Sequence, residues 1–150
     1  MFRVDQIDHV EVFVPSRREA AQWYQRVLGC EIVAEYEHWS KSDAGPLMIS
    51  PDAGNTKLAL FRGEPQSGRP TAGFHLVAFR VDGPSFITFV KDVSSLELTN
   101  HRGETVTSKS AVDHGQAFSI YFNDPYGHRL EITTYDSEVV REALEQTVKS

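Results

Sequence analysis

The chain has 150 residues, with 40% hydrophobic and 24% charged residues and a net charge of −6. This length fits one compact domain or two small units that share a core, and the acidic balance argues against nucleic acid or an acidic membrane surface as a partner. No apolar run approaches the roughly 20 residues that span a bilayer, and a single cysteine, Cys30, without an apolar leader leads us to expect a cytoplasmic protein.

The first part of the chain predicts the element order βαβββ. A strand is expected over 7–14, after which Ser16 can cap an amphipathic helix over 17–28 that ends at Gly29. Three further strands are expected at 30–36, 47–50 and 57–61, and residues 52–55 have turn chemistry.

The second part predicts the same order again. A polar connector with two prolines and three glycines covers 63–73. After it we expect a strand over 74–81, a helix over 85–96, and strands at 105–111, 118–122 and 129–134. We therefore expect an α+β fold with module one over 1–62, a linker over 63–73, module two over 74–136 and a C-terminal helix over 137–150. Two such modules would pair, so that eight strands curl around a cleft.

Polar residues occur at matching places in these apolar strands. His9 and His75 each lie near the start of the first strand of a module, and Glu131 lies in the last strand between Leu130 and Ile132. Strand alternation places Glu131 on the face opposite these two apolar neighbours. Taken singly, each residue is explained by hydrogen bonding or solvent exposure. Together, two imidazoles and a carboxylate suit a divalent transition metal and leave coordination positions open.

Four segments in this order resemble the vicinal oxygen chelate superfamily, which includes glyoxalases, bleomycin-resistance proteins and extradiol dioxygenases. They are Asp8-His9-Val10, Trp23-Tyr24-Gln25-Arg26-Val27-Leu28-Gly29, Phe74-His75-Leu76-Val77-Ala78-Phe79 and Tyr121-Phe122-Asn123-Asp124-Pro125-Tyr126-Gly127-His128-Arg129-Leu130-Glu131. The resemblance implies paired βαβββ modules that form an eight-stranded cup. It also implies a metal held by His9, His75 and Glu131, with Fe(II) or Mn(II) ahead of Zn(II) or Ni(II). A small-molecule substrate is expected, and a homodimer is compatible with the family.

The resemblance also points to Tyr121 and His114. Extradiol dioxygenases carry a tyrosine beside the metal-bound catechol, on the strand before the glutamate ligand, and Tyr121 resembles it. The same family segment carries a histidine, commonly a little further upstream than His114. A functional His114 would act as a general base or a hydrogen-bond donor. The alternative for the pair is a packed tyrosine and a loop histidine in solvent.

The leading function is an extradiol-type ring-cleaving dioxygenase. Two departures bear on it: residues 55–60 lack the histidine that dioxygenases use in handling oxygen, and residues 58–61 lack the carboxylate that glyoxalases use as a fourth ligand. A lyase or isomerase of the same superfamily is an alternative. So are a non-catalytic drug-binding protein and a fosfomycin-type thiol transferase, although the sequence shows no clear basic cluster for a phosphate.

Overall fold

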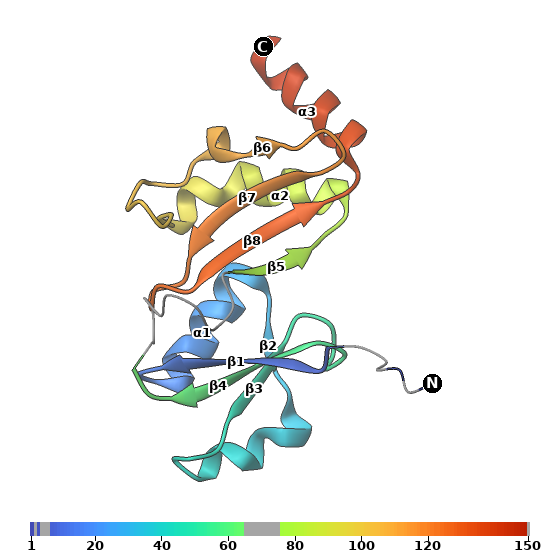
Figure 1. The fold of residues 1–150 in the computed structure, drawn as a ribbon. Helices are drawn as coiled ribbons and strands as arrows, with labels where there is room; N and C mark the ends of the chain where they lie inside the picture. Colours follow the sequence, from blue (N-terminus) through green and yellow to red (C-terminus); the bar gives the residue numbers. More distant parts are fainter. Residues whose placement is uncertain (2, 4–6, 65–75, 150) are drawn as a thin grey trace. The chain divides into compact units, whose positions relative to one another are not determined.

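The computed structural model describes residues 1, 3, 7–64 and 76–149. The chain divides into two compact units, Met1–Gln66 and Ser67–Ser150, and each contains one four-stranded sheet (Figure 1). The predicted α+β class is therefore confirmed. Among the described residues, none of the helices combines the length and apolar character that a bilayer crossing requires.

The first unit contains a sheet with strand order β1-β4-β3-β2. Its strands β1 and β4 run parallel, and the other neighbours are antiparallel. A parallel pair needs a crossover, which this unit makes through a helix and two intervening strands. The elements are β1 (His9–Val14), α1 (Arg17–Leu28), β2 (Glu31–Ile32), the 3₁₀ helix η1 (Ala34–Lys41), β3 (Leu47–Ser50) and β4 (Lys57–Arg62).

The second unit repeats this topology with strand order β5-β8-β7-β6, in which β5 and β8 are the parallel pair. The internal repeat expected from the sequence is thus present in the strand order of both sheets, and the predicted C-terminal helix is present as α3. The elements are β5 (Val77–Arg80), α2 (Gly83–Asp92), η2 (Val93–Leu96), η3 (Ser108–Ser110), β6 (Val112–Asp113), β7 (Phe118–Asn123), β8 (Arg129–Thr134) and α3 (Ser137–Lys149).

The helix of each unit begins at a side-chain cap. Ser16 Oγ accepts a hydrogen bond from the backbone N–H of Glu19 at 3.3 Å, and Gly29 ends α1 with φ +67°. In α2, Asp82 Oδ1 accepts from the backbone N–H of Ser85 at 2.8 Å. The helix expected over 17–28 is therefore observed with those bounds. The second helix starts at Gly83, two residues earlier than expected, because Asp82 is its cap and Pro84 belongs to its first turn.

Two expected strands are mostly not formed. The strand predicted over 30–36 is reduced to β2, and the chain then turns into η1, where Tyr36 and Trp39 stack with ring centroids 4.6 Å apart. Residues three apart eclipse one another in a 3₁₀ helix, so this spacing favours the turn over the strand. The strand predicted over 105–111 was also wrong. Thr107 caps η3 by accepting from the backbone N–H of Lys109, which diverts this segment from sheet pairing.

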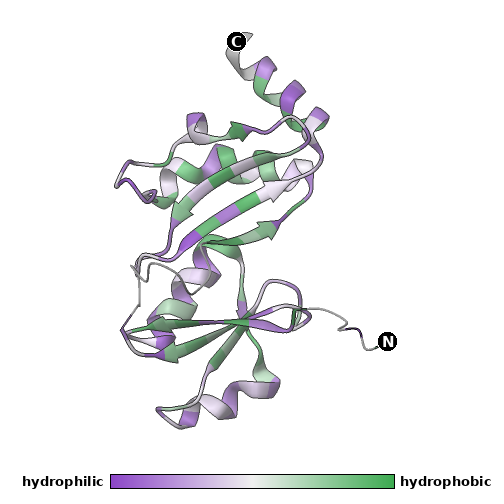
Figure 2. Ribbon diagram, viewed as in Figure 1, coloured by the Kyte–Doolittle hydropathy of each residue, from purple (hydrophilic) through white to green (hydrophobic). Residues whose placement is uncertain are grey.

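The cores of the two units lie between one face of each sheet and its helix. In the first unit, α1 packs on β3 and β4 and buries Tyr24 against the sheet. In the second, α2 packs on β8, which buries Leu130 and Ile132. Hydrophobic and hydrophilic residues alternate along β8 in Figure 2, as expected for a strand with one covered face.

The single cysteine provides a test of this packing. Cys30 is 1% exposed, and burial, with a smaller contribution from Asp52, raises the pKa of its thiol to about 12. Because the thiolate is the nucleophile, the folded protein should not react with a disulfide reagent at about pH 8. Thiol counting should give one reactive group per chain after unfolding in guanidinium. Rapid labelling of the folded protein would mean that this region opens readily.

Candidate functional site

The register of β8 places Glu131 between two neighbouring strands on one face of the sheet. Glu131 lies directly opposite Tyr121 of β7 and pairs with Ala78 of β5. Residues that oppose one another in a sheet point to the same face. Since Leu130 and Ile132 are buried on the face that α2 covers, Glu131 and Tyr121 share the other face, which we call the polar face of unit 2.

The Glu131 carboxylate is held by a neighbour on this face. Ser119 Oγ, in a residue that is 1% exposed, donates a hydrogen bond of 2.6 Å to Glu131 Oε1, and it lies 3.1 Å from Thr133 Oγ1. No described residue donates to Oε2 of Glu131. The short, charge-assisted bond therefore fixes the carboxylate while one oxygen is left to accept another partner. Ser119 was not among the predicted site residues, although its spacing from Tyr121 places it on the same face.

Tyr121 and His114 form a direct pair. His114 Nε2 lies 3.0 Å from the Tyr121 hydroxyl, and either group can donate, depending on the histidine tautomer. The backbone N–H of His114 bonds to the carbonyl of Ala117 at 2.8 Å, in the loop that joins β6 to β7. The structure thus brings together the two predicted catalytic residues, with Tyr121 opposite Glu131.

The His114 loop is anchored to the C-terminal helix by Arg141. Nε and Nη2 of Arg141 donate to the two carboxylate oxygens of Asp113, each at 3.2 Å. Nη2 also donates to the carbonyl of Gly115 at 2.9 Å. Arg141, and then the backbone N–H of Gly115, lower the pKa of Asp113 below its ordinary value. The carboxylate therefore stays ionised through neutral pH, and Arg141 contacts the residues on both sides of His114.

In the first unit, His9 lies between two carboxylates, those of Asp8 and Glu11. Its Nδ1 lies 2.7 Å from Asp8 Oδ2, and Lys57 Nζ donates to the other oxygen of Asp8 at 3.0 Å. These bonds, the one from His9 first, lower the pKa of Asp8. A carboxylate on one ring nitrogen of a ligating histidine fixes the tautomer and orients the other nitrogen. Here that nitrogen is Nε2, which lies 3.6 Å from Glu11 Oε1.

Glu11 was missed in the sequence analysis. It lies two residues after His9 in β1 and therefore on the same face, beside a pocket of about 230 Å³. The stacked rings of Tyr36 and Trp39 also line this pocket. A carboxylate two positions from a strand histidine was the signal that could have identified Glu11.

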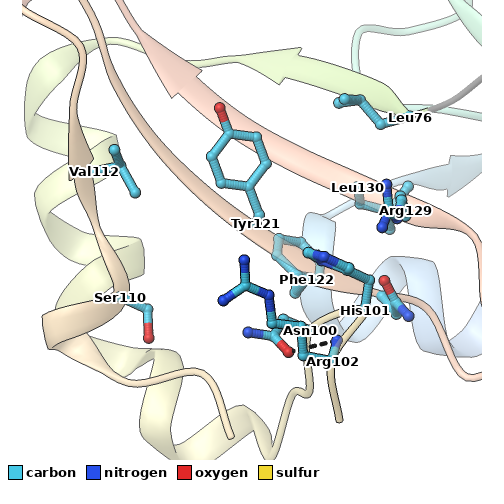
Figure 3. A pocket seen from close by; sticks show the side chains of 11 residues that line it. Leu76, Asn100, His101, Arg102, Ser110, Val112, Tyr121, Phe122, Arg129 and Leu130 are labelled. Carbon is cyan, nitrogen blue, oxygen red and sulfur yellow. Dashed lines mark hydrogen bonds between the residues drawn. The ribbon is translucent and has the colours of Figure 1, made fainter. Parts of the chain in front are cut away.

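A larger pocket, of about 400 Å³, lies within the second unit (Figure 3). Tyr121 and Arg129 reach it from β7 and β8, and His101 and Arg102 reach it from the loop between η2 and η3. His101 is exposed, as a solvated residue would be, but it also lines this pocket. Arg129 is far from His101 and Arg102 in the sequence, so the three residues formed no visible cluster there.

Of the three predicted metal ligands, His75 lies outside the described residues, and His9 and Glu131 belong to different units. Among the side chains that the structure describes, no three of His, Cys, Asp or Glu converge to hold an ion. The donor set of His9, His75 and Glu131 therefore stays a prediction.

Comparisons with known proteins give one family and one fold. The model of the Glyoxalase/Bleomycin resistance protein/Dioxygenase superfamily matches residues 6–132. The fold is similar to that of the oxidase ChaP-H2, with a TM-score of 0.62, 21% identity, and 88% of this chain and 94% of that chain covered. It is also similar to the fosfomycin resistance protein FosX from Listeria monocytogenes, with a TM-score of 0.65, 14% identity, and 92% and 99% covered.

A mutant of the Listeria FosX, solved with Mn(II) and a dihydroxypropylphosphonic acid, gives a TM-score of 0.63 at 14% identity, with 95% of this chain and 99% of that chain covered. A comparison with curated protein sequences gives no significant match. At these identities the solved structures establish the fold and no more.

The anchoring role of Arg141 can be tested by amide hydrogen exchange. Replacing it in Arg141→Gln removes the bonds to Asp113 and Gly115, so exchange across 113–117 should accelerate by about three- to tenfold. The pKa of Asp113 is lowered, so its contribution is present above the ordinary value of 3.8 and is lost only as the pH falls through the lowered one. Exchange measured near neutral pH therefore samples the intact anchor.

Glu138→Gln is the matched control, since it removes another partner of Arg141 but leaves the contacts with Asp113 and Gly115. Equal exchange in the two variants would show that α3 does not hold the loop.

Proposed function

The chain belongs to the Glyoxalase/Bleomycin resistance protein/Dioxygenase superfamily, and from this premise we propose that it is a metal-dependent enzyme acting on a small substrate with two adjacent oxygen atoms. The observation that carries the proposal is the hydrogen-bonded pair of Tyr121 and His114, with Tyr121 directly opposite Glu131. An ionisable hydroxyl next to a carboxylate ligand is the arrangement that metal-assisted proton transfer requires.

The proposed ligands are His9, His75 and Glu131, with Fe(II) or Mn(II) as the preferred ion and Zn(II) or Ni(II) as alternatives. Two features of the described residues fit this set. Glu131 keeps Oε2 without a donor among them, and His9 has Nδ1 held by Asp8, so that Nε2 would be the ligating atom. A bound ion would act as a Lewis acid that lowers the pKa of a coordinated substrate hydroxyl.

The chain's own residues would then move the proton. With His114 Nε2 unprotonated, the Tyr121 hydroxyl would pass its proton to that nitrogen as the phenolic oxygen takes the proton of a substrate hydroxyl, so that the proton ends on His114. Ser119 keeps the Glu131 carboxylate in one orientation, and Arg141 keeps the His114 loop against β7. Neither of these two residues has to touch the substrate, so each is a positioning residue.

Ring cleavage by an extradiol-type dioxygenase is the leading reaction, because it uses a tyrosine at the place of Tyr121. The strand β4 presents Lys57, Ala59 and Phe61 on the face of His9, and none of these replaces the missing oxygen-handling histidine. A second candidate is a fosfomycin-type reaction on a phosphonate. It is favoured by the shared pocket of Arg102 and Arg129, which supplies the basic cluster that the sequence did not reveal.

Metal content distinguishes an enzyme of this kind from a binding protein that needs no metal. His9→Ala, His75→Ala and Glu131→Gln should each lose tight binding of Fe(II) and Mn(II), because each removes one of three protein donors. His101→Ala should keep it, since that histidine is not in the donor set. Elemental analysis after loading and dialysis makes the comparison. Equal metal content in all four variants would show that the donor set is wrong.

Turnover tests the role of Tyr121. Protein reconstituted with Fe(II) without air and mixed with catechols should consume oxygen once air is admitted. Tyr121→Phe should keep its metal and lower kcat by about 10²–10⁴-fold, the usual contribution of general acid–base catalysis. An unchanged rate on a substrate that the wild type cleaves would reduce Tyr121 to a packing residue.

A further inference from the structure

We propose that the pocket of the second unit shown in Figure 3 is an anion subsite, in which Arg102 and Arg129 bind a carboxylate or phosphonate group of an organic substrate. The subsite lies within one unit, and its volume of about 400 Å³ falls in the ~300–1,000 Å³ range of small-molecule sites. The inference rests on the proposed function in one respect, namely that the bound molecule is the substrate of the proposed metal-dependent reaction.

The first argument is charge. Among the described residues that line the pocket are Arg102, Arg129 and His101, but no aspartate or glutamate. The whole chain has 21 Asp and Glu residues against 15 Lys and Arg residues, so a pocket with two arginines and no carboxylate departs from its average. A concave site lined by one sign of charge concentrates ligands of the opposite sign.

The second argument is that the loop carrying Arg102 is fixed in place. Asn100 Oδ1 accepts from the backbone N–H groups of Arg102 at 2.9 Å and Glu104 at 3.1 Å. The Asn100 amide donates to Glu104 Oε2 at 2.9 Å, so the carboxylate of this loop is engaged there. The backbone N–H of Asn123 in β7 bonds to the carbonyl of Thr99 at 2.8 Å, which joins the loop to the sheet.

The third argument is the guanidinium of Arg102. No described residue accepts a hydrogen bond from it or pairs with it, and Figure 3 shows it extending toward Tyr121. By contrast, Arg141 of the same unit is paired with Asp113 and Glu138. A guanidinium offers several N–H donors in a planar fork that matches carboxylate and phosphonate oxygens. Arg102 is an exposed residue, so its guanidinium can exchange bound water for an oxyanion from solution.

The fourth argument is position. Arg129 is opposite Asn123 in the β7–β8 register and lies two residues before Glu131, so it is on the same polar face. Tyr121 lines the pocket and opposes Glu131. A substrate anchored at the arginines would therefore extend past Tyr121, the proposed proton-transfer residue. Leu76 and Val112 add an apolar wall suited to its hydrocarbon part.

Binding of three simple probes to the full chain tests the subsite. Benzoate and phenylphosphonate carry the two kinds of anionic group, and benzamide is the neutral counterpart. Each is titrated into chelator-treated protein, so that no bound ion can hold the anion, and amide NMR shifts are followed. Both anions, or one of them, should shift residues 99–103 and 121–123, and benzamide should bind at least about tenfold more weakly, because a charge-assisted hydrogen bond is lost.

Variants distinguish binding by these two arginines from a nonspecific effect of the protein's positive charges. Arg102→Gln and Arg129→Gln should each weaken binding of the anions by about tenfold, and Arg129→Lys should restore part of the loss. Arg80→Gln is the control, since Arg80 is an exposed arginine of β5 that does not line the pocket. Equal weakening in Arg80→Gln, equal binding of benzamide, or shifts elsewhere in the protein would overturn the proposal.

The outcome for the proposed function is read separately. Glu131→Gln should lose the metal and keep benzoate or phenylphosphonate binding. A protein that binds the anions but takes up no metal would retain the subsite and refute the metal-dependent function. A protein that binds metal but neither anion would retain the metal-dependent function and refute the subsite. A preference for phenylphosphonate over benzoate would identify the phosphonate group as the substrate's anion, and the opposite preference would identify a carboxylate.

Discussion

The pairing of β7 with β8 is the constraint on which the candidate site depends. In the observed register, Phe122 opposes Leu130 and Ile120 opposes Ile132, and all four are buried. Burying one such side chain stabilises the fold by about 1.5–3 kcal/mol, whereas a single hydrogen bond contributes roughly 1 kcal/mol. Apolar packing therefore decides the register. A slip of one residue would turn Glu131 into the core and expose its neighbours.

The two units share a topology but differ in the residues on the sheet face opposite the helix. Each begins with a strand that runs parallel to the last strand of its sheet, and in each a capped helix packs on the opposite face. The first unit presents His9 and Glu11 on β1. The second presents Glu131 and Tyr121 on β8 and β7. A repeated scaffold thus supplies chemically different groups from equivalent surfaces, as expected when function depends on the site more than on the fold.

Each candidate side chain is oriented by a neighbour that does not need to react. Ser119 holds the Glu131 carboxylate, Asp8 holds the His9 ring, and Arg141 holds the loop of His114. Such supporting contacts matter because a catalytic group must be kept close to its productive geometry. Ser119 is 1% exposed, so its hydroxyl has little contact with solvent and its bond to Glu131 is well protected.

Local pattern alone predicted that the helices and most strands exist, and it placed Glu131 and Tyr121 on the face away from the core. Ser16 and Gly29 marked both ends of α1, and the alternation around Glu131 separated it from the core, because caps and periodicity depend on residues close in the chain. The turn that replaces the expected strand after Cys30 was not foreseen, since aromatic stacking in η1 outweighed a weak alternation.

Tertiary structure decided the contacts between strands, loops and helices. The anchoring by Arg141 and the common pocket of Arg102 and Arg129 join residues far apart in the chain, and the bond from His114 to Tyr121 forms across the paired strands β6 and β7. No local period encodes such pairs, because their proximity follows from burial of the apolar side chains between the sheets and their helices.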